Sequence, residues 1–292
     1  MYYEIFSIIS PVFICALIGF FWMRLQQPFD TDFVSKIILY ISTPCLIFAT
    51  FMEVSVDKDA FLDLLLAAFI TTMAFGVIAW PILKALEIDL HAFLPSQMFP
   101  NCGNMGLPLC LLAFGNEGLA LGLTYFTINA VLHFSIGQSI SVGHISVKSF
   151  LRNPIFITVI ITTFMVFNNL KAPAWIYNST AILGGIAIPL MLIGLGVSLA
   201  QFKISSLKLS LSLSVFRLLM GFLVGIGISA LLGLEGAARG VVILQCSMPI
   251  AVFSYLFASQ NNRRPEEVAG TVVLSTILSF LTLPFLLLYI LP

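Results

Sequence analysis

The sequence predicts an all-α polytopic membrane protein with ten transmembrane helices, organised as two inverted repeats of five. The prediction rests on the composition, on ten long apolar runs, and on an internal similarity at an offset of about 145 residues. Of the 292 residues, 60% are apolar and only 9% are charged, against roughly 25% charged residues in a soluble globular domain. With a net charge of zero, this composition excludes a soluble enzyme, a disordered chain and a nucleic-acid-binding protein.

Ten apolar runs are long enough to be membrane spans, because a helix needs roughly 20 apolar residues to cross about 30 Å of hydrocarbon. They cover residues 3–23, 33–52, 62–83, 92–114, 118–140, 153–168, 175–200, 207–232, 238–259 and 268–291. The runs are continuously apolar rather than alternating, so a transmembrane β-barrel is not expected. The short connections leave no room for a soluble domain, and the lipid bilayer is the expected surrounding. The first run has no basic segment before it and is interpreted as a span rather than a signal peptide.

The basic residues indicate the orientation of these spans. The connections and span ends that follow the odd-numbered spans carry nine Lys or Arg residues: Arg24, Lys36, Lys84, Lys148, Arg152, Lys203, Lys208, Arg263 and Arg264. The opposite side carries three: Lys58, Lys171 and Arg239. By the positive-inside rule the first side is cytoplasmic. We therefore expect a multi-pass protein of the bacterial inner (cell) membrane with both termini outside, on the periplasmic side.

An internal repeat divides the chain into residues 1–146 and 147–292. Four matches occur in the same order at offsets of 143 to 147 residues: Pro11–Ile14 with Pro154–Ile157, Pro44 with Pro189, Phe69–Phe75 with Phe216–Phe222, and Asn101–Asn104 with Cys246–Pro249. A repeat of five spans contains an odd number of crossings, so the second copy must be inverted. Inverted repeats are typical of secondary transporters, in which one bundle moves against another around a site at the membrane midplane.

Two of the spans contain a polar, proline-rich interruption, and these are the candidate transport site. In span 4, Pro100 and Pro108 each remove a helical hydrogen bond, and Gly103 and Gly106 relax the backbone between them. Paired helix breaks in corresponding spans indicate a substrate site. The candidate binding residues are Asn101, Cys102, Gly103, Asn104, Gln245, Cys246, Ser247 and Pro249. The residues expected to form the breaks are Pro100, Gly106, Pro108 and Met248.

The alternative for each proline is a simple kink, in which nearby polar side chains bind the freed carbonyl groups. For Pro44 and Pro189 we favour a kink, although they remain candidates for support of the site. At the two polar breaks we favour a binding site. The N-terminus of a half-helix carries a partial positive charge, so such a site suits an anion, for example a carboxylate.

The other polar residues within spans do not determine whether transport is coupled to protons or to sodium. Glu4, Glu53, Glu117 and Glu235 all lie near span ends, so a carboxylate relay for protons or sodium is not expected. His133 can titrate near neutral pH and shares a helix face with Asn129; it serves either in coupling and support or as a neutral hydrogen-bonding group. Arg217 either binds the anion, snorkels to the surface or contacts backbone carbonyls.

No motif for another chemistry is present in the sequence. It contains no phosphate-binding loop, no pairing of a nucleophile with a base and no metal-ligand spacing, so we expect neither an enzyme nor an ATP-driven pump, and neither a metal nor a cofactor. The five cysteines lie inside spans and are interpreted as small apolar residues. The Gly118–Gly122 and Gly221–Gly225 pairs permit close packing of helices, either within the chain or in a homodimer.

The stretch NCGNMGLPLCLLAFG (Asn101–Gly115), with Met248-Pro249 and VVLSTILSFLTLP (Val272–Pro284), resembles the auxin efflux carrier family. That family includes bacterial malonate and other organic-acid carriers and the plant PIN proteins. The resemblance covers all ten spans. It implies that helices 4 and 9 are broken and cross at the substrate site, and that the substrates are organic anions with carboxylate groups. The family's break falls on Asn101, Gly103, Asn104, Gly106 and Pro108, and the second crossing proline falls on Pro249.

The function expected from the sequence is therefore secondary transport of small organic anions. One alternative is a sodium-coupled symporter of the bile-acid type, which shares the inverted architecture and would show sodium dependence. Another is a substrate-gated channel or a sensor, which would show no counterflow. One departure from the plant family members is the short connection around residues 141–152, which leaves no room for their long cytoplasmic loop.

Overall fold

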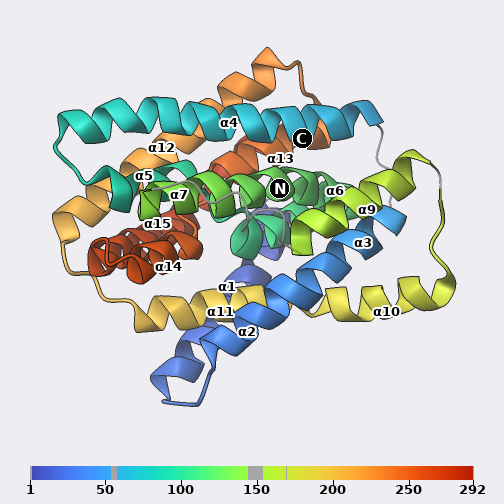
Figure 1. Cartoon of the computed structure of the whole chain (residues 1–292), viewed down its shortest axis with the longest axis horizontal. Helices are drawn as coiled ribbons and strands as arrows, with labels where there is room; N and C mark the ends of the chain where they lie inside the picture. The colour runs from blue at the N-terminus through green and yellow to red at the C-terminus, as the bar shows by residue number, and fades with distance from the viewer. Residues whose placement is uncertain (1, 54–57, 144–153, 169, 292) are drawn as a thin grey trace.

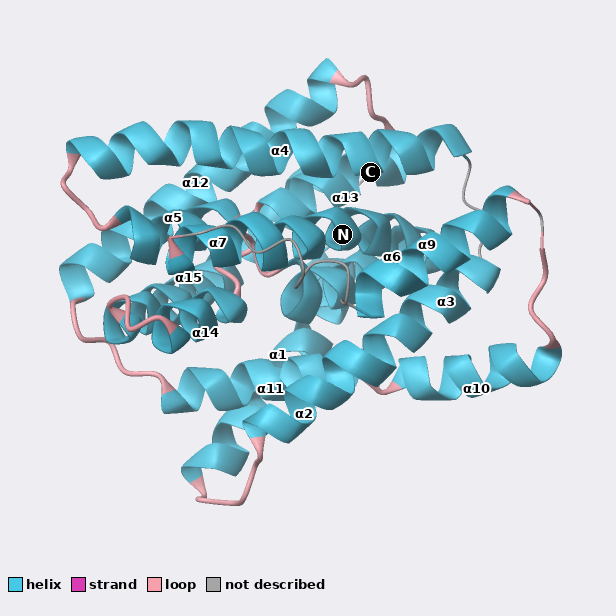
Figure 2. Cartoon of the chain, viewed as in Figure 1, coloured by secondary structure: helices cyan, strands magenta, loops and turns pink. Residues whose placement is uncertain are grey.

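The computed structural model describes residues 2–53, 58–143, 154–168 and 170–291 (Figure 1). Within these ranges the regular structure is helical, apart from one isolated β-bridge between Pro100 and Ile250 (Figure 2). Each of the ten predicted apolar runs falls on one or more helices. The predicted boundary between residues 146 and 147 lies outside the described residues, as do Lys148 and Arg152.

Seven helical segments are long and apolar enough to cross a membrane. They are Tyr2–Arg24, Thr31–Glu53, Asp59–Ala85, Cys102–Val142, Ala174–Gln201, Leu207–Leu231 and Pro265–Ile290. The remaining apolar helices are shorter. Helix α5 (Leu90–Met98) is followed by a helix break in the middle of a predicted span. Helix α14 (Val252–Gln260) is preceded by such a break. The chain is therefore a polytopic helical membrane protein.

One group of helices, the first bundle, forms around the N-terminal helix. It contains α1 (Tyr2–Arg24), α2 (Thr31–Ile37), the π-helix η1 (Ile38–Ser42), α3 (Thr43–Glu53), α9 (Pro154–Phe167), α10 (Ala174–Gly185) and α11 (Ala187–Gln201). Within it α1 packs along α11, and α3 packs against α9 and α10. The α1–α11 contact is very close, because a Cβ atom on Gly196 would overlap the Ala16 carbonyl oxygen, and one on Gly19 would overlap that of Ile193.

The other helices make up the second bundle. They are α4 (Lys58–Ala85), α5, the π-helix η2 (Cys102–Gly106), α6 (Leu107–Leu132), the π-helix η3 (His133–Gly137), α7 (Gln138–Val142), α12 (Leu207–Leu231), α13 (Gly236–Cys246), α14 and α15 (Pro265–Ile290). Here α4 packs against α5, α6 and α12, and α12 also packs against α13 and α15. Figure 1 shows α4 along one edge of the molecule and α10 and α11 along the opposite edge, with the broken helices between them.

The chain changes direction at Gly115, between the fourth and fifth predicted spans. This residue interrupts α6 with φ 66° and ψ −156°, a conformation that is accessible almost only to glycine. The segment after it then packs against the segment before it, since a Cβ on Gly118 would overlap the Cys110 carbonyl oxygen. The apolar stretch from 102 to 142 is thereby divided into two antiparallel parts.

A Gly115→Ala variant is expected to lower the free energy of unfolding by about 1–3 kcal/mol. No heavy atom lies within 4 Å of an added Cβ, so the cost comes from the backbone conformation alone. The measurement is the thermal unfolding midpoint of the purified protein in detergent. Gly227→Ala on α12 is the matched control, because it also meets no atom within 4 Å and replaces a helical glycine by a better helix former. Equal midpoints for the two variants would contradict the role assigned to the backbone at Gly115.

Candidate functional site

The two helix breaks contact each other through their backbones. Helix α5 ends at Met98 and η2 begins at Cys102, while α13 ends at Cys246 and α14 begins at Val252. Between them the Asn101 N–H donates to the Pro249 carbonyl at 2.7 Å, and the Ala251 N–H donates to the Phe99 carbonyl at 3.1 Å. The two breaks therefore run antiparallel through a single bridge, between Pro100 and Ile250.

A cavity lies beside this crossing, between the two bundles. It is small, because the centre of a water-sized molecule can occupy only about 30 Å³ of it. The first bundle contributes Ile38, Leu39, Thr43 and Met191. The second bundle contributes Pro100, Asn101, Cys102, Gly103, Asn104, Phe126, Asn129, Ala130, His133, Phe134, Ala251 and Phe253. No Asp, Glu, Lys or Arg is among these lining residues.

Three of the lining side chains carry a buried polar atom without a hydrogen-bond partner. They are the Nδ2 atoms of Asn101 and Asn129 and the Oγ1 atom of Thr43. Their residues are only 4%, 3% and 0% exposed. An unpaired buried polar group costs about 1–3 kcal/mol, and most such groups in proteins have a protein or water partner. Two amide donors and a hydroxyl at one cavity can together bind the oxygen atoms of a ligand.

His133 lies in the wall of the cavity and is held on three sides. Its ring stacks on Phe99 with a centroid separation of 4.3 Å and meets Phe257 edge to face at 5.2 Å. Its Nε2 atom is 3.3 Å from the Ser254 hydroxyl. The His133 ring thus connects η3 to Phe99 at the end of α5 and to α14, the helix that follows the second break. Whether His133 serves in coupling and support or as a neutral hydrogen-bonding group stays a prediction.

All three π-helices of the described residues supply cavity residues. η1 contributes Ile38 and Leu39, η2 contributes Cys102, Gly103 and Asn104, and η3 contributes His133 and Phe134. A π-helical turn contains one residue more than an α-helical turn, and such turns occur frequently at functional sites. Here three helical segments that meet at the cavity each carry such a turn.

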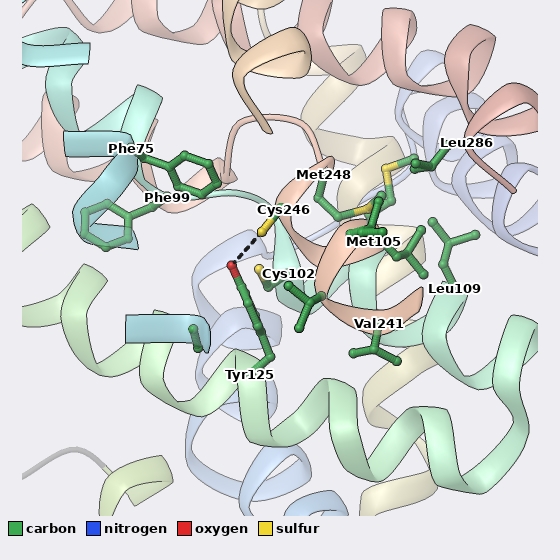
Figure 3. Close-up of a cluster of buried hydrophobic side chains, with 14 of the residues drawn as sticks. Phe75, Phe99, Cys102, Met105, Leu109, Tyr125, Val241, Cys246, Met248 and Leu286 are labelled. Carbon is green, nitrogen blue, oxygen red and sulfur yellow. Dashed lines mark hydrogen bonds between the residues drawn. The ribbon is translucent and has the colours of Figure 1, made fainter. Parts of the chain in front are cut away.

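The predicted residues of the second break do not line this cavity: Gln245, Cys246, Ser247, Met248 and Pro249. Gln245 donates through Nε2 to the Gly122 carbonyl at 3.4 Å, and a Cβ on Gly106 would overlap its Oε1 atom. Cys246 Sγ is 3.3 Å from the Tyr125 hydroxyl, with Cys102 beside it (Figure 3). Ser247 donates to the Ile243 carbonyl. Met248 is fully buried and belongs to the same apolar cluster as Met105 (Figure 3).

The remaining predicted prolines lie in first helical turns. Pro44 follows η1 as the second residue of α3, Pro189 is the third residue of α11, and Pro108 is the second residue of α6. The first turns of α3 and α6 are continuous with η1 and η2, so Pro44 and Pro108 lie inside longer helical segments, directly after a π-helical turn. None of the three lines the cavity, and the interpretation of Pro44 and Pro189 as kinks stays a prediction.

Sequence reasoning missed the residues that the first bundle brings to the cavity. Thr43 and the neighbouring Ser42 are both fully buried, and both have an unpartnered hydroxyl. The available signal was the polar pair immediately before Pro44 in an otherwise apolar span. Leu39, Phe126, Met191 and Phe253 gave no signal, because apolar residues are the rule in every span.

The chain is similar to known transport proteins along most of its length. A family model described as "Membrane transport protein" matches residues 4–144 and 138–287. An uncharacterised transporter of Methanothermobacter thermautotrophicus is 28% identical over 268 residues, which is 87% of each chain. The uncharacterised transporter MJ1031 of Methanocaldococcus jannaschii is 25% identical over 300 residues, covering 95% of this chain and 96% of the relative.

Proposed function

Because the chain belongs to the membrane transport protein family, the auxin efflux carrier family, we propose that it is a secondary carrier of small organic anions with carboxylate groups. The proposed binding site is the cavity at the crossing of the two breaks. The observation that carries the proposal is the set of three unpartnered polar groups, on Thr43, Asn101 and Asn129. They offer hydrogen bonds to acceptor oxygens in a cavity whose lining includes no carboxylate.

The electrostatics of the helix ends support an anion at this place. The N-terminal end of η2 at Cys102 and residues at the N-terminal end of α14, Ala251 and Phe253, line the cavity. The N–H groups at a helix start have no intrahelical partners and carry a partial positive charge, which favours a bound anion. The unpartnered amides of Asn101 and Asn129 add neutral donors to this field.

We further propose that the two halves of the chain are inverted repeats. Exchanging the halves exchanges α1 with α9, the α2–α3 segment with α10–α11, α4 with α12, and α5 with α13. The observed packing is consistent with this exchange: α1 packs on α11 as α9 packs on α3, and α4 packs on α5 as α12 packs on α13. Because the cavity lies between the two bundles, movement of one bundle against the other would expose it to each side of the membrane in turn.

The proposed location is the cell membrane, with both termini outside. This orientation rests on the distribution of Lys and Arg between the two sets of connections. Both relatives come from archaea, and the bacterial inner membrane stays a prediction.

Solid-supported-membrane electrophysiology on proteoliposomes tests the proposed function. Pulses of mono- and dicarboxylates, given with and without sodium, are expected to evoke a saturable current for at least one carboxylate, because binding and translocation of an anion move charge. Counterflow with the labelled form of that carboxylate must also be observed, since a channel cannot show it. A current that requires sodium would favour the symporter. Absence of both current and counterflow for every carboxylate would contradict the proposal.

A further inference from the structure

Arg217 is a buried cation in the middle of α12. It is 0% exposed and is the largest side chain in the fully buried set. The ion pairs within the described part of the chain are Lys36–Asp32 and Arg264–Glu267, so no carboxylate there neutralises Arg217. A charged group inside a membrane protein is costly and commonly functional. In the first half of the chain, Ile70 occupies the position that corresponds to Arg217. Only the second half therefore carries a charge at this position.

The guanidinium binds a carbonyl at the end of each broken helix. Its Nη1 atom donates to the Gln97 carbonyl at 2.8 Å, and its Nη2 atom donates to the Cys246 carbonyl at 2.9 Å. The ring of Phe75 lies beneath it, with 4.2 Å from Cζ to the ring centroid. Gln97 is in the last turn of α5 and Cys246 is the last residue of α13, where the helix dipoles are negative.

These two carbonyls are among those that the breaks leave without their helical partners. In a continuous helix the Gln97 carbonyl would bind the Asn101 N–H, which instead donates to Pro249. The Cys246 carbonyl would bind the Ile250 N–H, which instead donates to the Ser275 hydroxyl at 3.2 Å. Arg217 therefore replaces both lost hydrogen bonds with a single side chain, and so joins the two half-helices.

We propose that Arg217 is the positioning residue of the transport site and its fixed positive charge. It holds the two half-helices at the crossing and makes the cavity attract anions without touching the substrate itself. The proposal rests on the proposed function and extends it, because it assigns anion selectivity to a residue outside the cavity lining.

The distance is short enough for this charge to matter. Arg217 Nη1 is bonded to the Gln97 carbonyl, and Gln97 lies four residues before the lining residue Asn101, so the backbones of these two residues are separated by at most about 14 Å. At roughly 12 Å and an effective dielectric constant of about 20, a unit charge changes the local concentration of a monovalent anion about tenfold. The lining holds no charged group that would oppose this effect.

The test measures the electrostatic potential in the cavity without requiring the substrate. The five cysteines are replaced by Ala in the full chain, and Phe134, a half-buried lining residue, is replaced by Cys. Two methanethiosulfonate reagents of similar size, one bearing a sulfonate and one a trimethylammonium group, then react with this thiol. Relative to a free thiol in solution, the anionic reagent is expected to be favoured at least about tenfold over the cationic one.

Variants at Arg217 separate its charge from its packing. Arg217→Gln is expected to reduce the preference at least about tenfold, because the charge acts on the two reagents in opposite directions, Arg217→Lys to retain most of it, and the control Phe75→Leu to leave it unchanged. A neutral methanethiosulfonate should modify all of them at similar rates. An unchanged preference in a folded Arg217→Gln variant would overturn the proposal, because a purely structural arginine would alter stability and not the charge ratio.

The measurement with Arg217 in place remains decisive even where Arg217→Gln does not fold. A preference no greater than that of the free thiol would overturn the role of Arg217 and leave the carrier proposal intact. If neither reagent modified the Phe134→Cys chain above the cysteine-free background, the cavity would be closed to water. That result would overturn the proposed site together with the role of Arg217.

Discussion

Replacement of Asn101 by Ala is expected to lower the saturable carboxylate current at least about tenfold. The reason is that Asn101 lines the cavity and that its Nδ2 atom is buried without a protein partner, so we expect a bound anion to be the acceptor it lacks. A hydrogen bond to a charged group contributes about 1.5–3 kcal/mol, which corresponds to roughly 10- to 150-fold in affinity. The measurement is the concentration dependence of the current in proteoliposomes, compared with that of the unmodified protein.

The same substitution is expected to leave the fold intact. The backbone N–H of Asn101 makes the bond to Pro249, and Ala retains it. Loss of an unpaired buried amide removes a desolvation penalty rather than a contact. Asn168→Ala is the control, because its amide donates to the Phe164 carbonyl on the exposed end of α9, away from the cavity. Normal current in Asn101→Ala, or an equal loss in both variants, would contradict the assigned site.

Replacement of Gly196 by Ala is expected to lower the thermal unfolding midpoint by about 5–10 °C. The added Cβ would overlap the Ala16 carbonyl oxygen and lie 2.7 Å from its carbon and 2.8 Å from the Phe20 nitrogen. These are backbone atoms, so α1 must move away from α11 to admit the methyl group. Overpacking of this kind costs about 1–3 kcal/mol or more, and each kcal/mol shifts the midpoint of a chain this size by roughly 2–4 °C.

Gly194→Ala provides the matched control for this packing. It lies on the same helix two residues away, and an added Cβ there meets no atom within 4 Å. That variant is expected to keep or raise the midpoint, because Ala favours a helix by about 1 kcal/mol over Gly. If Gly196→Ala and Gly194→Ala unfold at the same temperature, the close α1–α11 contact does not contribute to stability.

The apolar runs predicted the helices, and the polar residues and prolines that interrupt these runs predicted the helix breaks. The apolar runs located the helices, because about twenty apolar residues in succession match the length that a helix needs to cross the hydrocarbon core. Pro100, Asn101 and Pro249 were recognisable because prolines and amides are costly in an apolar helix. The structure places these three residues within one pair of backbone hydrogen bonds.

The contribution of the first bundle and the contacts of Arg217 could not be predicted in this way. Thr43 lines the cavity directly after the π-helix η1, and a local sequence pattern does not predict a π turn, which is rare. For Arg217 the sequence permitted three roles, and the contact with backbone carbonyls is the one observed. Its two acceptors are 120 and 29 residues away along the chain, beyond the reach of any local pattern.

The bridge between the two breaks has a consequence for the energy of any rearrangement there. Pro100 and Pro249 lack an N–H group, so neither can donate, and the pairing cannot lengthen into a ladder through these residues. Opening of the bridge itself breaks the backbone bonds from Asn101 and Ala251, and the bonds from Arg217 to the Gln97 and Cys246 carbonyls are separate from it. At about 0.5–1.5 kcal/mol net for each bond, the cost is about 1–3 kcal/mol, less than the roughly 4 kcal/mol released by a ligand that binds with a millimolar Kd. The backbone bridge can therefore open and close reversibly, because the free energy needed to open it is smaller than the binding free energy of one weakly bound ligand.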